Sequence, residues 1–248
     1  MAAPGPIGYA HRGYAPDGAE NTLAAFQAAV ELGFTHLETD ARVTRDGVAV
    51  AFHDPMLDRI TNSTGLLRQL DWHRVRQARV LGRHPIPVLA DVLGGFPDAA
   101  FNVDVKSDAA IGPTLDALRH TNSWHRVRLA AFSHRRLMAL RRAAGPAVAS
   151  SLSPVEVAAL KLGRLRPPDL GTERLPGAAQ VPLGVAAVPL ISARFVENAH
   201  RLGLQVHAWT INTRAEMGRL FDVGVDAIMS DRAELLREVL RERGAWPG

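Results

Sequence analysis

Short apolar runs rich in Val, Ile, Leu and Ala recur along the chain and alternate with longer segments of helical period. The short runs predict strands and the longer segments predict helices, which is the pattern of repeated strand–helix units around a parallel sheet. The expected strands are residues 6–10, 36–43, 100–105, 127–131, 147–151, 178–182, 204–209 and 226–229. The expected helices are residues 21–32, 88–93, 113–120, 134–144, 154–162, 192–202, 213–223 and 232–243.

A glycine directly follows most of these predicted helices. Glycine readily adopts the left-handed conformation that ends a helix, so each is expected to be a helix stop. The stops are Gly33, Gly94, Gly145, Gly163, Gly203 and Gly224. Eight strand–helix units in 248 residues match the size of a TIM (β/α)8 barrel. The length also suits two small domains, but a single α/β barrel domain over residues 1–248 is the prediction.

Two segments interrupt this alternation. Residues 48–87 begin with a short apolar alternation, continue into a polar stretch and follow the second predicted strand. An insertion there is expected on the face where barrel enzymes have their sites, so it is a candidate lid or substrate-specificity element. Residues 164–177 are rich in Pro and Gly and predict a loop.

Composition narrows the classes of function. The chain has no Cys, which excludes disulfides, a thiol nucleophile and zinc–thiolate or iron–sulfur sites. The net charge of +4 suits anionic ligands, but Arg pairs on predicted helices account for much of it, and no nucleic-acid motif is present. No apolar run is long enough to span a membrane and no signal-like segment opens the chain, so we expect a cytoplasmic protein without stable membrane anchoring. The oligomeric state is left open.

Acidic side chains lie at the ends of neighbouring predicted strands. Glu38 and Asp40 are two residues apart and project from one face, as do Asp104 and Lys106 on the next strand. Three carboxylates at one barrel mouth could hold Mg²⁺ or Ca²⁺, one ion in all. The alternatives are solvated strand ends or buried ion pairs with Arg12 and Lys106. We favour the metal, because two cations leave one of three acids uncompensated.

Other residues at the same predicted mouth suit phosphate chemistry. His11 and His53 could act as general acid and base, although ordinary loop histidines are the alternative. Arg12 and Lys106 suit a phosphate group.

Three further positions have two interpretations each. Gly13 allows either a close backbone approach or simply a turn. Asn21 opens a predicted helix, where capping is favoured over an amide that contacts the ligand. Trp209 could form a pocket wall or fill the barrel.

The ordered motifs resemble the glycerophosphodiester phosphodiesterase family over nearly the whole chain. They are His11-Arg12-Gly13, Glu20-Asn21-Thr22, Glu38-Thr39-Asp40, His53-Asp54, Trp209-Thr210-Ile211-Asn212, Gly224-Val225-Asp226 and Ser230-Asp231. The resemblance implies a TIM barrel with a small insertion after strand two, a divalent metal, and hydrolysis to glycerol 3-phosphate and an alcohol. It also implies His11 and His53 as the acid–base pair, Glu38 and Asp40 as metal ligands, and Arg12 and Lys106 as phosphate contacts. Asp104 departs from the family, whose third ligand is often Glu.

The expected reaction has the glycerol hydroxyl attack phosphorus to form a cyclic phosphate, which water then opens. Three other functions stay open on the same fold. They are a lysophospholipase D or phosphoinositide-type phosphodiesterase, a non-catalytic phosphoester-binding barrel, and a metal-dependent aldolase-like barrel.

Overall fold

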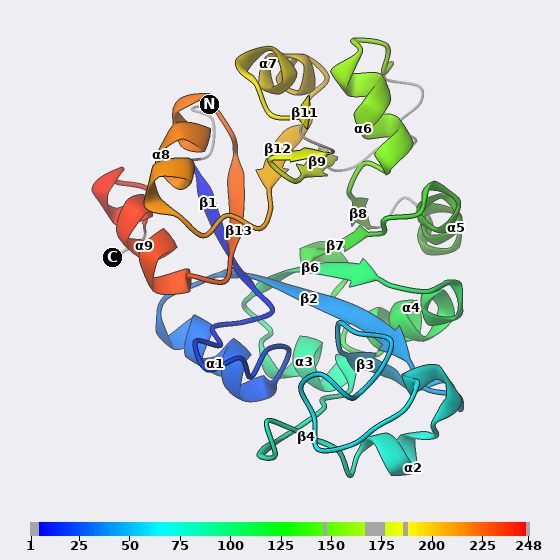
Figure 1. The fold of residues 1–248 in the computed structure, drawn as a ribbon. Helices are drawn as coiled ribbons and strands as arrows, with labels where there is room; N and C mark the ends of the chain where they lie inside the picture. The colour runs from blue at the N-terminus through cyan, green and yellow to red at the C-terminus, as the bar shows by residue number, and fades with distance from the viewer. Residues whose placement is uncertain (1–4, 146–147, 167–176, 186–187, 247–248) are drawn as a thin grey trace.

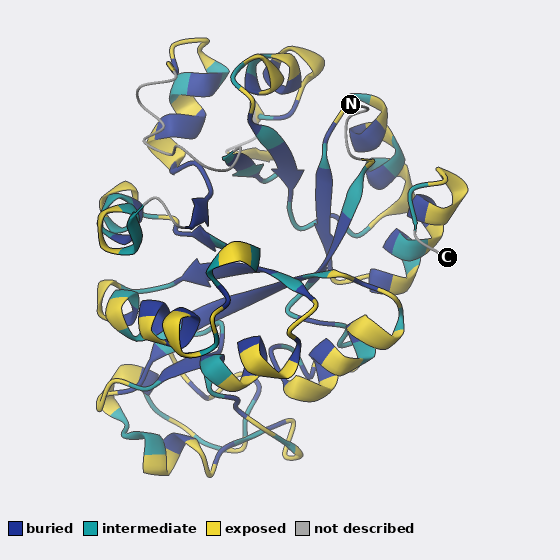
Figure 2. Ribbon diagram, turned by 180° about the vertical axis from the view of Figure 1, so that it is seen from behind, coloured by how far each residue is buried: buried dark blue, intermediate teal, exposed yellow. Residues whose placement is uncertain are grey.

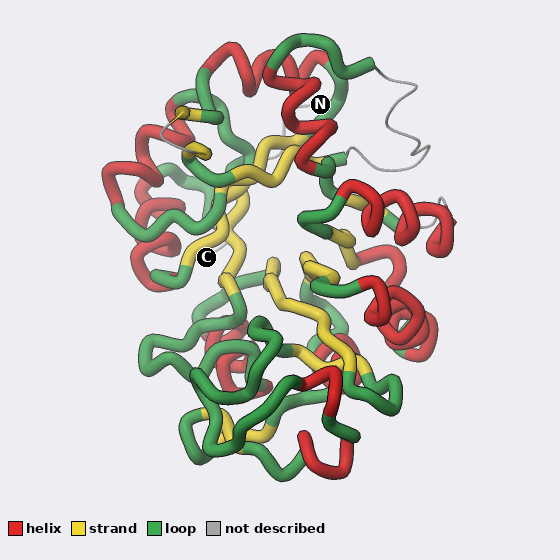
Figure 3. The backbone as a smooth tube through the Cα atoms, turned by 45° about the vertical axis from the view of Figure 1, so that its right-hand side comes forward, coloured by secondary structure: helices red, strands yellow, loops and turns green. Residues whose placement is uncertain are grey.

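The structure, a computed structural model, describes residues 5–145, 148–166, 177–185 and 188–246. Within these residues, eight parallel strands form a barrel with helices packed around it (Figures 1 and 3). The strands are β1 (Ile7–His11), β2 (His36–Val43), β6 (Ala100–Val105), β7 (Val127–Ala130), β8 (Ala149–Ser150), β9 (Ala178–Val181), β12 (Gln205–Ala208) and β13 (Ala227–Ser230). The main helices are α1 (Leu23–Glu31), α3 (Leu89–Gly95), α4 (Ile111–His120), α5 (His134–Ala144), α6 (Pro154–Lys161), α7 (Ala193–Arg201), α8 (Arg214–Asp222) and α9 (Ala233–Glu242).

The strands pair in the order β8, β7, β6, β2, β1, β13, β12, β9, which includes every strand predicted from the sequence. The first and last strands meet through a parallel bridge between Ser151 and Ala178. The Leu152 N–H also donates to the Ala178 carbonyl at 2.8 Å across this seam. The prediction of a TIM barrel is therefore confirmed.

Apolar side chains fill the space between the strands and the helices. The strands are buried along their length, and each helix turns one buried side inward and an exposed side outward (Figure 2). Phe26 of α1, for example, packs edge-on against Phe101 of β6 and Phe96. The helical period in the sequence thus reflects the burial of one face of each helix.

Some predicted element ends differ from the structure. The helix stop predicted at Gly94 is wrong, because α3 continues through Gly95. Phe96 ends this helix instead, leaving helical geometry (φ −128°, ψ 67°) where its ring packs into the core. Strand β8 is shorter than the predicted 147–151, of which residue 147 lies outside the described residues. Most of the loop predicted at 164–177 also lies outside them.

The segment predicted as an insertion, residues 48–87, is a small unit made mostly of loop beside one end of β2, and its first strand joins the barrel sheet (Figures 1 and 3). Its elements are β3 (Ala49–Ala51), which pairs antiparallel with β2, then η1 (Leu67–Gln69), α2 (Trp72–Val75), β4 (Arg79–Val80) and β5 (His84–Pro85). The unit has an apolar cluster of its own that includes Phe52, Leu57 and Ile86. Its role as a lid stays a prediction.

Short 3-10 turns at η2 (Asp108–Ala110) and η3 (Trp124–Arg126) join the remaining units. A hairpin of β10 (Gly184–Val185) and β11 (Val188–Pro189) follows β9, where no strand was predicted. In the part of the chain that is described, none of the helices has the length and apolar character needed to cross a bilayer.

Candidate active site

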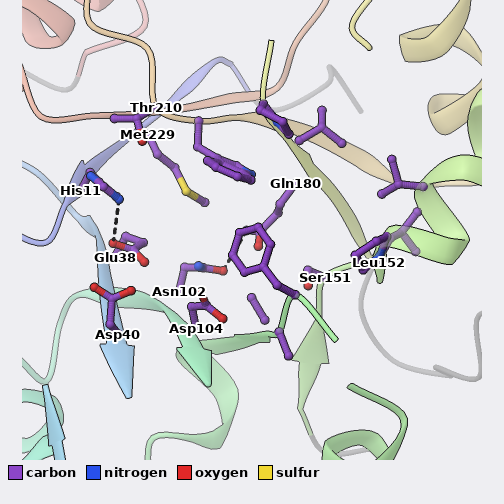
Figure 4. A pocket seen from close by; sticks show the side chains of 18 of the residues that line it. His11, Glu38, Asp40, Asn102, Asp104, Ser151, Leu152, Gln180, Thr210 and Met229 are labelled. Carbon is purple, nitrogen blue, oxygen red and sulfur yellow. Dashed lines mark hydrogen bonds and ion pairs between the residues drawn. The ribbon is translucent and has the colours of Figure 1, made fainter. Parts of the chain in front are cut away.

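A pocket of about 560 Å³ opens where the barrel strands end. This is the face on which TIM-barrel enzymes assemble their sites. The structure brings nearly all of the predicted site residues to its lining, and four of them, His11, Glu38, Asp40 and Asp104, are labelled in Figure 4. The predicted residues on the lining are His11, Arg12, Glu38, Asp40, His53, Asp104, Lys106 and Trp209.

The turn after β1 has an unusual backbone that aims His11 and Arg12 at the pocket. Arg12 and Gly13 both have positive φ angles, of 57° and 85°. A Cβ atom on Gly13 would lie 2.7 Å from the backbone carbon of Ala25 in α1. The adjacent Tyr14 N–H donates to the Ala25 carbonyl at 2.8 Å. The close backbone approach that Gly13 allows is therefore an approach to α1.

Asn21 lies behind Asp40 and is almost fully buried. Its Nδ2 donates to Asp40 Oδ2 at 2.9 Å, and its Oδ1 accepts from Thr39 Oγ1 at 2.7 Å. The expectation that Asn21 caps α1 is wrong, since Thr22 is the N-cap and accepts from the Ala25 N–H. Asn21 is not on the pocket lining, so its amide fixes the Asp40 carboxylate from behind.

Buried acids and cations alternate across the strand ends. Asp40 and Asp104 are directly paired positions on β2 and β6, where two carboxylates would repel. Lys106 bridges them, with Nζ 2.7 Å from Asp40 Oδ1 and 2.5 Å from Asp104 Oδ2. Arg12 Nε lies 3.1 Å from Asp40 Oδ2, and its Nη1 donates to Glu20 at 3.0 Å. Ion pairs with Arg12 and Lys106 therefore do form.

The three acids differ in their electrostatic balance. Burial, reinforced by the charge of Asp40, raises the pKa of Glu38 to about 7 against the opposing effects of His11, Lys106 and Arg12. Burial also acts to raise the pKa of Asp40, but Lys106 and Arg12 outweigh it and the pKa is lowered. Glu38 is thus the acid that the nearby cations leave least compensated.

Part of this acid cluster suits a hard divalent cation. Among the described residues, no three His, Cys, Asp or Glu side chains already form a metal-binding group. Asp104 Oδ1 is nevertheless buried and has no hydrogen-bond partner. Burial raises the pKa of Asp104 although Lys106 opposes it. The orphan oxygen of Asp104 and the least compensated carboxylate, Glu38, both line the pocket, and they are the oxygen donors that Mg²⁺ or Ca²⁺ prefers, so the residues fit such an ion.

His11 is oriented by a carboxylate just after the last barrel strand, β13. Its Nδ1 lies 2.6 Å from Asp231 Oδ1, and Asn212 Nδ2 donates to the other Asp231 oxygen at 2.8 Å. Its Nε2 faces Glu38 at 3.7 Å (Figure 4). Burial acts to lower the pKa of His11, but Glu38 and Asp231 outweigh it and the pKa is raised.

His53, which belongs to the insertion, is also oriented by a carboxylate. Its Nδ1 lies 2.6 Å from Asp54 Oδ1. Arg59 donates through Nε to the other Asp54 oxygen, and through Nη2 to Glu20 at 2.5 Å. Glu20 also accepts from Arg12. Arg59 therefore links Asp54, which contacts His53, to Glu20, which contacts Arg12.

A comparison with protein families identifies the chain. The Glycerophosphoryl diester phosphodiesterase family matches residues 11–235. The chain belongs to this family. It is 39% identical to the "Probable glycerophosphodiester phosphodiesterase 2" of Mycobacterium tuberculosis, with 98% of this chain and 94% of the relative covered. The resemblance expected from the sequence motifs is confirmed, and the chain is a phosphoric diester hydrolase.

Solved structures of glycerophosphodiester phosphodiesterases have the same fold. A putative glycerophosphoryl diester phosphodiesterase from Silicibacter pomeroyi superposes with a TM-score of 0.81, at 20% identity, covering 98% of this chain and 96% of that one. A phosphodiesterase from Oleispira antarctica, in complex with the product sn-glycerol-3-phosphate, gives a TM-score of 0.77 at 20% identity, covering 95% and 97%.

Several residues at this phosphodiesterase site had no role predicted from the sequence. Asp54 and Asp231 belong to recognised motifs, and their places beside a histidine and at a strand end were the available signal. Arg59 and Phe132 have no such signal. Phe132 lies on the pocket, edge-on to Trp209 at 5.2 Å between ring centroids. Trp209 itself both lines the pocket and packs on a small cluster at β1 and β13.

Proposed function

We propose that the pocket hydrolyses a glycerophosphodiester to glycerol 3-phosphate and an alcohol, with His11 and His53 as the acid–base pair. The observation that carries this proposal is the paired arrangement of the two histidines. Each has Nδ1 held by a carboxylate and both line one pocket. A ring nitrogen fixed in this way leaves Nε2 to accept or donate the substrate proton.

Glu38, Asp40 and Asp104 are the residues that would hold one divalent cation, Mg²⁺ or Ca²⁺. The uncompensated Glu38 and the orphan Asp104 oxygen support this assignment. When bound, such an ion would polarise the phosphoryl group and acidify the glycerol hydroxyl. Asn21 then acts as a positioning residue, because it holds the Asp40 carboxylate from behind.

In the proposed reaction, one histidine takes the proton of the glycerol 2-hydroxyl as its oxygen attacks phosphorus. The other histidine protonates the departing alcohol as its bond to phosphorus breaks, and a cyclic phosphate forms. Water opens this ring with the histidine roles reversed, which returns both to their starting states. The products are glycerol 3-phosphate and the alcohol.

We assign His11 as the base of the first step and His53 as the acid. Although burial opposes it, the pKa of His11 is raised by Glu38 and Asp231, which favours the protonated form that a base reaches in the first step. The side chain of His53 is the more exposed of the two, at 35% against 14%, which suits the side on which the alcohol leaves.

Arg12 and Lys106 would offset the charge on the phosphoryl oxygens. Lys106 gives two of its three donors to Asp40 and Asp104, so one is available to a phosphate. Arg12 donates through Nη1 to Glu20, and its Nε lies at ion-pair distance from Asp40, which leaves its other N–H groups to the pocket. The product-bound Oleispira antarctica phosphodiesterase supports a phosphate site in this fold.

Replacing each histidine by Ala tests the proposal. His11→Ala and His53→Ala should each reduce turnover of glycerophosphocholine by about 10²–10⁴-fold in the presence of Mg²⁺ or Ca²⁺. The control is His73→Ala, since His73 is exposed and outside the pocket. Chelator should abolish turnover by the wild type. Wild-type rates in both pocket variants would remove the acid–base assignment.

A substrate with p-nitrophenol as its alcohol separates the two histidine roles. This alcohol leaves without a proton, so a variant that lacks only the acid should be rescued. We expect His53→Ala to recover on glycerol phospho-p-nitrophenol and His11→Ala to stay slow. The opposite result would exchange the roles. No hydrolysis of any diester with either ion would favour a non-catalytic binding barrel.

The cytoplasmic location, the absence of stable membrane anchoring and the absence of nucleic-acid binding stay predictions of the sequence. Cell fractionation and a gel-shift assay test them directly. None of these three predictions affects the chemistry proposed for the pocket.

A further inference from the structure

The pocket has two halves of different chemistry. Its charged lining residues all come from β1, β2, β6 and the adjoining loops. Across from them, the lining from β7, α6, β9 and the β10–β11 hairpin carries no charged side chain among the described residues. In Figure 4, His11, Glu38 and Asp40 lie at one side and Leu152 at the other. We call the second side the apolar half, formed chiefly by Phe132, Leu152, Val157, Val181, Val185 and Leu190.

The apolar half is open to solvent at its rim. Phe132 and Val185 are each 57% exposed, although both line the pocket. Farther in, Leu152, Val157 and Val181 are buried. Exposed apolar side chains on this wall are unfavourable in water, so a ligand that covers them binds with a favourable change in free energy. The proposed reaction at the phosphate gives these residues no role.

Two polar side chains near the apolar half, Glu156 and Gln180, already make hydrogen bonds within the protein. Glu156, on α6, points away from the pocket, because its carboxylate accepts from Arg141 Nη1 at 2.6 Å and from the Ser153 N–H at 2.6 Å. Gln180 lies at the boundary and its Nε2 donates to Asn102 at 2.8 Å. A highly polar alcohol such as a sugar would find few hydrogen-bond partners on this wall.

The volume leaves room beyond the glycerophosphate. Benzene in a cavity of about 150 Å³ implies roughly 25 Å³ for each non-hydrogen atom. Glycerol 3-phosphate, with about ten such atoms, then needs about 250 Å³ at the same ratio. Of the cavity volume of about 560 Å³, about 300 Å³ is left, enough for roughly a dozen further atoms.

We infer that the apolar half binds a hydrocarbon chain carried by the phosphodiester substrate. The inference rests on the proposed function, because the charged half must hold the phosphate for the chain to reach this wall. The chain has two possible sources, an acyl group on the glycerol or a long alkyl alcohol on the other side of phosphorus. Both present the same unbranched chain to Phe132 and the residues around it.

Binding of alkyl phosphates tests the subsite without any turnover. Methyl, butyl and octyl phosphate would be titrated into the metal-loaded protein by calorimetry, below their micelle concentrations. Each methylene that is buried should tighten binding by about two- to fourfold, so octyl phosphate should bind at least about tenfold more tightly than methyl phosphate. Equal affinities across the series would overturn the inference.

Two valines provide a matched pair of variants. Val185 lines the apolar half, and Val155 on α6 is equally exposed, at 58%, but is not on the pocket lining. Val185→Glu should reduce the octyl-to-methyl affinity ratio by about tenfold, and Val155→Glu should retain the wild-type ratio. An equal loss in both variants would indicate adsorption to the protein surface and would contradict a subsite in the pocket.

Turnover identifies the source of the chain and separates the two proposals. The substrates are 1-octanoyl-glycerophosphocholine, the glycerol phosphodiester of octanol, and glycerophosphocholine as the chain-free reference. A kcat/KM at least about tenfold above the reference for one chain-bearing diester supports the subsite and names the chain's position. Hydrolysis of the reference alone, with a flat alkyl phosphate series, would overturn the subsite and leave the proposed function intact. A rising series without hydrolysis of any diester would support the subsite and overturn the proposed function.

Discussion

At the scale of single residues, the acids of the site differ in what holds them. Asp40 is contacted by Lys106, Arg12 and Asn21, so its negative charge is compensated from three sides. Glu38 accepts from the Arg12 backbone N–H at 3.2 Å and has no cationic side chain within ion-pair distance except His11 at 3.7 Å, among the described residues. In the metal-free protein, Glu38 is therefore the acid of the site whose negative charge is least compensated by cations.

This difference predicts how the stability of the metal-free protein depends on pH. The pKa of Glu38 is raised to about 7 in the fold, so the folded state holds a proton that the unfolded state loses near pH 4.5. Stability should therefore fall as pH rises from 4.5 to 7 and level off above that. Glu38→Gln removes the free-energy cost of holding this buried carboxylate in its charged form. With chelator at pH 8, this variant should therefore be more stable than wild type by on the order of 2 kcal/mol. Urea unfolding at pH 5 and pH 8 measures it.

Glu156 gives the matched control for this prediction. It is also buried, but Arg141 and the Ser153 N–H hold its carboxylate. Glu156→Gln should therefore lower the free energy of unfolding, the opposite sign to Glu38→Gln. Divalent cation should stabilise wild type more than Glu38→Gln. A Glu38→Gln protein less stable than wild type at pH 8 with chelator would disprove the electrostatic account of Glu38.

The sequence predicts which acids meet but not what holds them. Glu38, Asp40 and Asp104 are found because alternation along a strand fixes their face and parallel strands end at one barrel mouth. Asn21 was expected to cap α1, and instead bonds Asp40, because Thr22 takes the cap and the positive φ of Asn21 turns its amide inward. Such contacts depend on tertiary geometry that local pattern does not contain.

At the scale of elements, the turn between β1 and α1 requires glycine for two separable reasons. Gly13 and Gly18 have similar positive φ angles, of 85° and 89°. A Cβ on Gly13 would collide with Ala25, but one on Gly18 would meet nothing within 4 Å. Gly18→Ala should therefore cost about 1 kcal/mol from backbone strain alone, and Gly13→Ala about 1–3 kcal/mol more from the collision. Equal losses in urea unfolding would show that the packing on α1 is unimportant.

The insertion contributes to the site through Arg59 as well as His53. Arg59 bonds both Asp54 and Glu20, which in turn contact His53 and Arg12. Arg59→Gln should lower kcat by about tenfold, because loss of a partner that orients a functional side chain typically costs 10–100-fold in activity. It should also change the pH profile of kcat, a readout that simple loss of stability does not alter.

Arg83 is the control for Arg59. It too belongs to the insertion and reaches the β1–α1 segment, where its Nη2 lies 2.7 Å from Asp17. Asp17 does not line the pocket, so Arg83→Gln should retain wild-type kcat and its pH profile. An equal loss of activity in both variants would assign the effect to docking of the insertion rather than to orientation of His53 and Arg12.

The elements themselves are predictable to different extents. Strands β2 and β6 match their predicted bounds, because long buried runs have an unambiguous pattern. The β10–β11 hairpin was missed, since each of its strands has two residues and periodicity has no meaning over that length. That hairpin supplies Val185 to the apolar half, so the least predictable element forms part of the inferred chain site.

At the scale of the whole molecule, the barrel is not closed evenly. β6 pairs with β2 over six positions and with β7 over four. Among the described residues, β8 pairs with β7 over two positions, and one bridge at Ser151 joins this side to Ala178. Ser151 and Leu152 at this seam also line the pocket, and Leu152 belongs to the apolar half. The weakest join of the barrel therefore lies where the substrate chain is proposed to bind.

Hydrogen exchange should detect this uneven closure. The Leu152 N–H donates across the seam to Ala178 at 2.8 Å, and the Lys106 N–H donates to Ala41 at 3.0 Å across the strongly paired β2–β6 join. Each amide lies just beyond the end of its strand, so the two are matched in position. Because fewer paired residues must separate at the seam, the Leu152 amide should exchange at least about tenfold faster than the Lys106 amide. Octyl phosphate should slow the exchange of the Leu152 amide more than that of the Lys106 amide, since its chain would cover the seam. Equal protection of both amides in the free protein would show that the barrel opens as one cooperative unit.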